Sequence, residues 1–164
     1  MTAITPEKRL ETSGLILPPP PRPKGHYAPY AIAAAGAFVQ VSISGQTCRI
    51  DGVAMQGICQ ESDDLERPRL AAQVAMLNAL AALRVACDGQ LNRVQTITRL
   101  RGFIRSHSSF GAHTAVLNAA SDVLAKAWPD LPLPARTAVG VSSLPDGALI
   151  ELELEVLISA VHSA

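Results

Sequence analysis

The chain has 164 residues, 48% of them hydrophobic, and its 14 basic residues balance 14 acidic ones. That length and hydrophobic content suit one domain with a single core, and a neutral chain has no general electrostatic attraction for nucleic acid or an anionic membrane surface, so we expect neither partner. Met1-Thr2-Ala3 lacks the basic-then-apolar layout of a signal peptide, and no apolar run approaches the roughly 20 residues of a membrane span, so the expected location is the cytoplasm.

Residues 1–24 are expected to form an appendage, a helix followed by a proline-rich strap, ahead of a main domain over residues 25–160. Thr5-Pro6-Glu7-Lys8 predicts a helix start, because threonine caps the helix and proline fits its first turn, and Gly14 is a suitable stop. Residues 18–23 contain five prolines and favour an extended, stiff connector laid over the domain surface. A ligand for a proline-reading domain is the alternative.

The segment after the strap predicts two strands and a loop. The first strand lies within residues 33–44, is carried by Phe38, Val39, Val41 and Ile43, and ends at Gly45. Residues 48–50 form a short return strand closed by Asp51-Gly52, a dipeptide suited to a tight turn. The polar, irregular residues 53–67 indicate a loop.

Residues 68–86 predict the first long helix, which ends at Asp88-Gly89. Helical periodicity gathers its alanines on one face: Ala71, Ala72, Ala75, Ala79, Ala82 and Ala86. Larger apolar residues surround that face, and only Arg69, Gln73, Asn78 and Arg84 interrupt them. A helix with so little polar surface should be covered on more than one side, by a sheet and by a second helix or another subunit.

The remaining sequence predicts strand, helix, strand, strand. Residues 94–105 alternate, with Val94, Thr96, Thr98, Leu100 and Ile104 on one face and Arg99, Arg101 and Arg105 on the other. Ser108 or Ser109 is the expected cap of a helix that ends near Asp130, with Phe110, Leu117, Leu124 and Trp128 on its inward stripe. Residues 137–142 and 148–159 are the last strands, joined by Leu144-Pro145-Asp146-Gly147. The whole order predicts an α+β sandwich, a mixed sheet with two helices on one face.

The charged strand faces need solvent or a partner. In the last strand Ile150, Leu152, Leu154, Val156 and Ile158 alternate with Glu151, Glu153 and Glu155. The glutamates and the three arginines of residues 94–105 are able to pair across the sheet, and each such pair contributes only about 0.2–1 kcal/mol. Alternation alone leaves a solvated face and a subunit interface open.

The cysteines and histidines do not indicate a metal centre. Cys48, Cys59 and Cys87 are odd in number and widely spaced, so neither a disulfide framework nor a zinc site is expected. Free cysteine behaves as a small buried apolar residue.

Five segments in register resemble the RidA/YjgF family of imine deaminases, also labelled endoribonuclease L-PSP. They are Gly25-His26-Tyr27-Ala28-Pro29-Tyr30, Ser44-Gly45-Gln46, the alanine-rich helix, the Phe110 helix with Ala120-Ser121-Asp122, and Ala135-Arg136 through Glu153. The resemblance covers residues 18–158 and is greatest to a longer, less characterised branch. It implies a chorismate-mutase-like fold, a homotrimer whose sheets close into a central barrel, and ligand clefts between subunits, and it favours the interface reading of the charged faces.

The resemblance also implies a chemistry that needs no metal or organic cofactor. Arg136 is expected to grip the carboxylate of a 2-imino acid, and Glu151 to orient or deprotonate the water that attacks the imine carbon. Tyr30, Ser44 and Gly45 are expected to shape the cleft, with Tyr27 as a rival for Tyr30. The Ala138 N–H is expected to add a third bond to the carboxylate. Thr114 is also expected in the site, where characterised relatives often carry asparagine, and Ala138 stands where they carry cysteine or serine.

Each residue has a structural alternative: an interface salt bridge for Arg136, one more solvated carboxylate for Glu151, packing for Tyr30 and a turn for Ser44. For the whole protein, the alternative to a deaminase is a non-catalytic or regulatory trimer that binds small carboxylates. The family's ribonuclease label agrees poorly with a neutral chain that has only six aromatic residues of the Phe, Tyr and Trp types. A chorismate mutase is possible by analogy of fold alone.

Overall fold

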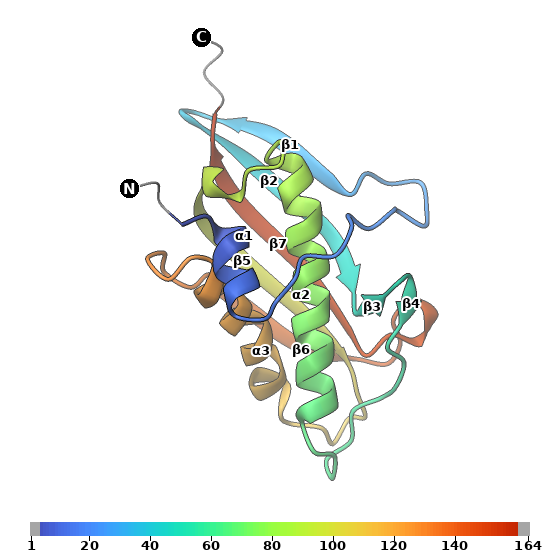
Figure 1. Cartoon of the computed structure of the whole chain (residues 1–164). Coiled ribbons are helices and arrows are strands. Elements are labelled where there is room, and N and C mark those ends of the chain that lie inside the picture. Colours follow the sequence, from blue (N-terminus) through green and yellow to red (C-terminus); the bar gives the residue numbers. More distant parts are fainter. Residues whose placement is uncertain (1–3, 161–164) are drawn as a thin grey trace.

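The computed structural model describes residues 4–160, in which one mixed sheet carries its helices on one face (Figure 1). The strands are β1 (Tyr30–Ala35), β2 (Phe38–Thr47), β5 (Val94–Arg105), β6 (Ala135–Val141) and β7 (Ile150–Ser159). Their spatial order is β1-β2-β7-β5-β6, with β5 and β6 parallel and the other pairs antiparallel. The helices are α1 (Pro6–Thr12), α2 (Glu66–Ala86) and α3 (His113–Ala127), and β3 (Arg49–Ile50) pairs with β4 (Val53–Ala54) in a separate hairpin. The α+β class and the mixed sheet are confirmed, while Met1-Thr2-Ala3, part of the basis for the expected location, lies outside the described residues.

The amino-terminal helix starts and stops where the sequence predicts. Thr5 Oγ1 accepts a hydrogen bond from the Lys8 N–H at 3.3 Å, and Gly14 adopts a φ of +76° two residues after the helix ends. Leu10 is nevertheless fully buried in the core, and the Glu7 carboxylate accepts the Leu91 N–H at 3.0 Å. The segment expected to be an appendage therefore contributes to the packed core.

The strand predicted from Phe38, Val39, Val41 and Ile43 is confirmed as β2, but residues 33–35 belong to a separate strand, β1, which forms a hairpin with it. They pair antiparallel from Tyr30 beside Ile43 to Ala35 beside Phe38, and Gly36 turns the chain with a φ of +65°. Alanine has little strand preference, so Ala31 to Ala35 gave no separate strand signal. β2 also runs past Gly45 to Thr47, through a register shift between Ile43 and Gln46.

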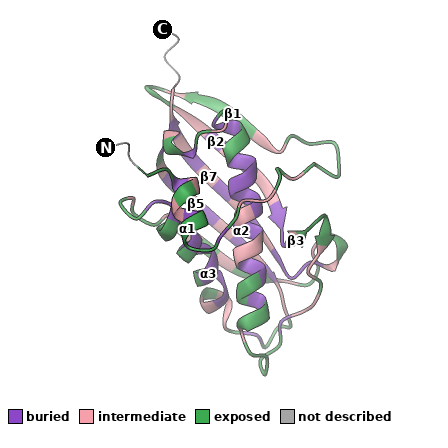
Figure 2. Cartoon of the chain, viewed as in Figure 1, coloured by how far each residue is buried: buried purple, intermediate pink, exposed green. Residues whose placement is uncertain are grey.

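The long helix α2 begins at Glu66, two residues before the predicted start, and packs against both the sheet and α3. Its alanine face is buried, as predicted (Figure 2). Asn78 is not on a solvated face: it is only 6% exposed, and its Nδ2 donates to the carbonyl oxygens of Thr47 and Arg49 at 3.0 Å each. Among the described residues α2 is the one helix apolar and long enough for a membrane span, but 67% of that window is buried in the fold, as in a core helix.

The two central strands carry the core. The alternation predicted for β7 is confirmed, with its five apolar residues buried and its glutamates on the opposite face. In β5 the predicted alternation fails near its start: Ile97 is buried and Thr98 is exposed. Two register irregularities against β7, on either side of Thr96 and Ile97, account for this. Arg101 pairs with Glu153 at 3.2 Å and with Glu155 at 2.9 Å, whereas Arg105 donates to backbone carbonyls.

Helix α3 begins at His113 with Ala112 at its cap, so the predicted serine cap is wrong. Residues 107–110 instead form a turn in which the Phe110 N–H donates to the His107 carbonyl at 3.1 Å. The predicted inward stripe is buried as expected: Phe110, Leu117, Leu124 and Trp128. β6 begins two residues earlier than predicted and β7 two residues later, after a 3₁₀ turn over Pro145–Gly147.

Replacing Gly102 with alanine is expected to destabilise the fold by about 1–3 kcal/mol, the usual cost of overpacking. A Cβ at this position in β5 would lie 2.5 Å from Cδ1 of Leu117, a fully buried side chain on α3. Urea unfolding measures the difference. Gly111→Ala is the matched control because its Cβ would meet no atom within 4 Å. Equal stabilities of the two variants would contradict this packing.

Candidate functional site

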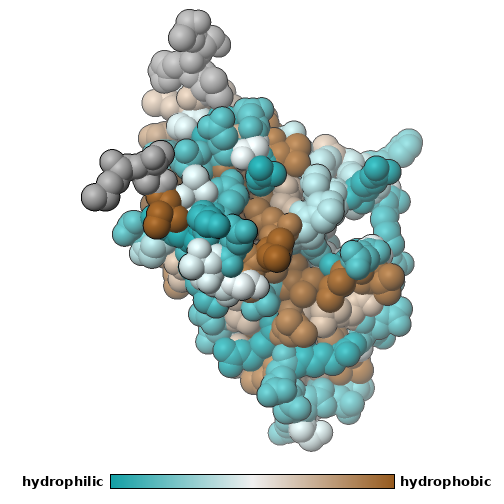
Figure 3. Space-filling view, viewed as in Figure 1, coloured by the Kyte–Doolittle hydropathy of each residue, from teal (hydrophilic) through white to brown (hydrophobic). Residues whose placement is uncertain are grey.

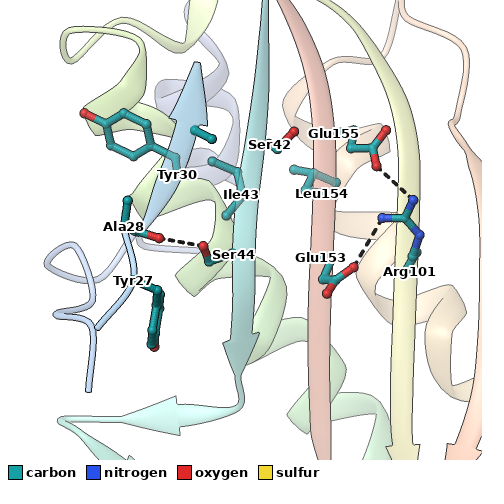
Figure 4. A pocket seen from close by; sticks show the side chains of 11 residues that line it. Tyr27, Ala28, Tyr30, Ser42, Ile43, Ser44, Arg101, Glu153, Leu154 and Glu155 are labelled. Atoms are coloured by element: carbon teal, nitrogen blue, oxygen red, sulfur yellow. Dashed lines mark hydrogen bonds and ion pairs between the residues drawn. The ribbon is translucent and has the colours of Figure 1, made fainter. Parts of the chain in front are cut away.

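We call the face of the sheet that carries the β7 glutamates the charged face. A groove of about 380 Å³ lies on it (Figure 4). Tyr27, Tyr30 and Ser44 line it together with Arg101 and its two glutamates. Ser44 Oγ donates to the Ala28 carbonyl at 2.6 Å, so this hydroxyl ties the segment before β1 onto β2. Ser44 therefore holds the segment that contains Tyr27 and Tyr30 beside the sheet.

A larger hollow of about 680 Å³, which we call the strap cavity, lies between the prolines of residues 18–23, the end of β2 and α2. Gly45 and Glu151 lie in its wall, and Tyr27 borders both the strap cavity and the groove. In Figure 1 the strap crosses in front of α2 on its way to β1. The proline-rich segment thus forms one wall of a cavity whose lining also includes Glu151.

Glu151, one of the three glutamates of β7, has a carboxyl group with a clearly shifted pKa. Burial raises its pKa above the ordinary value, the neighbouring Glu153 raises it further, and Arg49 acts in the opposite direction. Room for this carboxylate depends on Gly45, because a Cβ there would lie 1.9 Å from Glu151 Oε1. A half-buried carboxyl group with a raised pKa in a cavity wall is a candidate for proton transfer.

Sequence reasoning missed an ion cluster at the mouth of the strap cavity. Asp146 Oδ2 accepts from Arg49 Nη2 at 2.6 Å and from Lys24 Nζ at 2.9 Å. These two cations, Lys24 first, lower the pKa of Asp146 below its ordinary value. Lys24 directly follows the strap, so the cluster joins the strap to the turn before β7. Positions 24, 49 and 146 are too far apart in sequence for any pattern to have linked them.

Arg136 extends from β6 toward α3. In the sheet it lies beside Leu100, a core residue, and so on the helix-covered face. Its Nη1 donates to Ser121 Oγ at 2.9 Å and its Nη2 to Asn118 Oδ1 at 2.6 Å. Both acceptors are neutral, and within residues 4–160 no carboxylate pairs with this guanidinium. A positive charge held in place without an anion suits an anionic ligand.

Thr114 and Ala138 lie on the Arg136 side of the molecule. Thr114 is exposed near the start of α3, and its spacing of four residues from Asn118 places it on the helix face that meets Arg136. Ala138 is half-buried in β6, beside Gly102. Arg136, Thr114 and Ala138 therefore form one group of predicted site residues, apart from the group around Glu151.

A single chain does not bring Arg136 and Glu151 together. They lie on opposite faces of the sheet, and β5 separates their strands. Tyr30 and Ser44 line the groove, and Gly45 and Glu151 line the strap cavity. The three cysteines are buried and unbonded, and across residues 4–160 no three His, Cys, Asp or Glu side chains are grouped closely enough to hold a metal ion.

A mixed five-stranded sheet with its helices on one face and a parallel β5–β6 pair connected through α3 define a chorismate-mutase-like α+β protein. The chain belongs to the family described as "YjgF/chorismate_mutase-like, putative endoribonuclease", whose model matches residues 7–150. The resemblance to RidA/YjgF proteins is thereby confirmed.

Three relatives illustrate the range of similarity. Protein TCP17 of Trypanosoma cruzi is 31% identical over 146 residues, 88% of each chain. A protein from Shewanella oneidensis, whose crystal structure is described as that of "a putative endoribonuclease", is 31% identical in sequence. The two structures match with a TM-score of 0.82 over 93% of this chain and 98% of that one. RidA from an Antarctic Psychrobacter is 25% identical with a TM-score of 0.55, over 85% and 94%. The fold thus agrees more closely with the Shewanella protein than with this RidA.

Proposed function

We propose that this protein hydrolyses reactive 2-imino acids, and their enamine tautomers, to 2-keto acids and ammonia. The observation that carries the proposal is the Glu151 carboxyl group, which is half-buried in the wall of the strap cavity with a raised pKa. Family membership supports the same assignment, because RidA proteins share the fold. The proposed reaction adds water without oxidation or reduction, so it requires no redox cofactor.

The proposed site is shared between copies of the chain, and we propose the homotrimer with a central barrel as the assembly. Two observations support a second copy. Arg136 and Glu151 cannot meet within one chain, and Arg136 carries a charge that its own chain leaves without a carboxylate among the described residues. In a cyclic assembly the β6 edge of one chain is able to approach the Glu151 wall of the next.

The residues take the following roles in the proposed reaction. Arg136 of one copy binds the substrate carboxylate through two parallel N–H donors, a geometry that lysine lacks. Glu151 of the other copy takes a proton from water as the water oxygen bonds to the imine carbon, and the C=N electron pair moves to nitrogen, which then takes that proton from Glu151. The hydroxyl group of the resulting carbinolamine gives its proton to Glu151, which passes it to nitrogen as the C–N bond breaks, the C=O bond forms and ammonia leaves.

The direct test is an assay in which an amino-acid dehydratase or oxidase supplies imines and the release of keto acid is followed. The protein is expected to shorten the lifetime of the imine relative to buffer. The same decay rate with and without protein would refute the proposal. Light scattering in the same buffer gives the mass of the assembly, and a monomer that is fully active would refute the shared site.

Replacing Gly45 with alanine is expected to lower imine turnover by about 10²-fold, the size of effect that a misplacement of about 1 Å produces. The new Cβ would lie 1.9 Å from Glu151 Oε1. Because that atom ends a flexible side chain, the carboxylate shifts while the fold survives. Turnover and the urea midpoint are measured together, with Gly111→Ala as the control. Unchanged turnover in Gly45→Ala would show that Glu151's position does not matter.

The endoribonuclease label of the family and of the Shewanella protein is the competing activity. A chain with equal numbers of acidic and basic residues has no general attraction for a polyanion. The imine assay and an RNA-degradation assay on one preparation separate the two activities, and we expect only the first to respond to Glu151→Gln.

A further inference from the structure

We propose that the strap cavity receives the side chain of the substrate, and that the preferred substrates are 2-imino acids with large apolar side chains, aromatic or branched aliphatic. This inference rests on the proposed function, because it takes Glu151 as the residue beside the reacting carbon. It assigns a role to the cavity, the strap and the apolar residues around them, which the proposed reaction by itself does not use.

The walls of the cavity are predominantly apolar. Val74 and Leu77 of α2 form one side, both half-buried, and the prolines of residues 18–23 form another. At the mouth Ile16 is 75% exposed and Ile50 is 53% exposed, although large aliphatic side chains usually avoid water. Figure 3 shows hydrophobic residues gathered over the middle of this face of the molecule. Exposed apolar residues gathered around a cavity mark a surface that meets an apolar ligand.

Three polar side chains of the wall are engaged by the protein itself. Asn78 donates to two backbone carbonyls, and Arg49 pairs with Asp146 at 2.6 Å. Gln46 Nε2 donates to the Ser44 carbonyl at 2.9 Å. Glu151 differs from these three, because no hydrogen bond to its carboxylate is found among the described residues. The cavity therefore places the Glu151 carboxyl group beside a largely apolar wall, which suits a reacting centre joined to an apolar chain.

The cavity is much larger than a very small side chain can fill. A volume of about 680 Å³ lies within the range of about 300–1,000 Å³ that is typical of organic ligand sites, and it is room for on the order of 20 water molecules at about 30 Å³ each. The methyl group of the alanine imine would leave nearly all of that water in place. Each additional methylene buried there is worth about fourfold in affinity, so aromatic and branched side chains gain most.

The strap is held in position to form this wall. Lys24, directly after residues 18–23, pairs with Asp146 at 2.9 Å, and at the other end Leu15 is buried in the core. Both ends of the proline-rich segment are thus fixed to the domain, and proline itself restricts the backbone between them. A wall fixed in this way presents a preformed apolar surface.

The test compares kcat/KM for the imines of alanine, leucine and phenylalanine, generated in situ by an amino-acid oxidase. The wild-type chain is expected to favour the phenylalanine imine over the alanine imine by at least about tenfold, from several buried methylene equivalents. Leu77→Trp fills the cavity and is expected to lower that ratio about tenfold. Leu70→Trp is the matched control, because Leu70 is 49% exposed on the same helix and does not line the cavity. A wild-type ratio near one, or the same ratio in Leu77→Trp, would overturn the inference.

A binding experiment separates failure of this inference from failure of the proposed function. Phenylpyruvate and pyruvate, two keto acids that cannot be hydrolysed further, are titrated into wild-type protein and Leu77→Trp by calorimetry. Tighter binding of phenylpyruvate that Leu77→Trp removes supports the cavity assignment, even if no imine is hydrolysed. Equal binding of both acids overturns it, even if imines are hydrolysed. A change in assembly mass in Leu77→Trp alone would show that the cavity seats a second copy of the chain, and would also overturn it.

Discussion

Replacing Glu151 with glutamine is expected to lower imine turnover by about 10²–10⁴-fold, the usual contribution of a positioned general acid or base. The amide keeps the shape of the side chain and cannot accept the proton of the attacking water. The affinity for a keto acid product should change little, because the carboxylate of the ligand is proposed to bind at Arg136. Single-turnover kinetics and calorimetry measure the two quantities separately.

The pH profile gives the same prediction a second readout. Burial and Glu153 raise the pKa of Glu151, so this carboxyl group takes up its proton at a higher pH than an ordinary glutamate. As a base it works deprotonated, so kcat/KM should fall as the pH drops through that raised pKa. The acidic limb should therefore lie above the ordinary glutamate range, and Glu151→Gln should abolish it.

The raised pKa of Glu151 affects folding stability in the opposite direction from activity: lower pH decreases turnover but favours the folded state. A folded-state pKa above the unfolded one means that the folded chain binds the proton more readily, so this group favours folding more as the pH falls from neutral through the folded pKa. Glu151→Gln should remove that part of the pH dependence of unfolding.

Glu155→Gln is the matched control for Glu151→Gln. Glu155→Gln removes a carboxylate from the same strand and the same face, where it pairs with Arg101 at 2.9 Å outside the strap cavity. It should retain turnover. If Glu151→Gln kept full turnover while keto acid binding and the biological effect of the protein were intact, the protein would be a carboxylate-binding or regulatory protein and not a hydrolase.

Mixing two inactive variants is expected to restore activity, because Arg136 and Glu151 are proposed to act across a subunit boundary. Arg136→Ala removes the carboxylate grip and should by itself lower kcat/KM by about 10²-fold or more, as expected for a lost charge-assisted pair. Unfolding Arg136→Ala and Glu151→Gln chains together in equal amounts and refolding them should give intact sites at about one quarter of the interfaces, since each required residue comes from the correct variant in half of the pairings.

The measurement is the turnover of the co-refolded mixture relative to wild type, with each variant refolded alone as the control. Recovery near one quarter supports the shared site. No recovery above the sum of the separate variants, with the wild-type assembly mass retained, would place Arg136 and Glu151 in separate roles. Arg136→Lys should recover little, because an ammonium cannot make two parallel hydrogen bonds to a carboxylate.

Much of the fold could be predicted from the sequence where one strong periodic pattern had a single structural solution. The alternation of β7 and the alanine face of α2 are both confirmed. The β1–β2 hairpin and the cap of α3 were missed because their signals are weak or ambiguous. Alanines do not distinguish a strand from its surroundings, and a serine pair near a helix start also suits the turn that the chain makes there.

Some residues of the candidate site could be identified from the sequence and others could not. Arg136 and Glu151 were identified by sequence, and their joint role stays a prediction. Arg49, Asp146 and Lys24 were not identified, because their cluster joins three segments that carry no common pattern.

By itself, then, the sequence determined the class of fold, the family, and which strand face is charged, because local periodicity and short motifs encode these features within a few residues of one another. The tertiary structure alone decided that the amino-terminal strap walls a cavity, that Gly45 makes room for Glu151, and that Arg136 and Glu151 occupy opposite faces of one sheet. Those relations join residues as far apart in the chain as Pro18 and Glu151, and only packing and strand order bring such residues together or keep them separate.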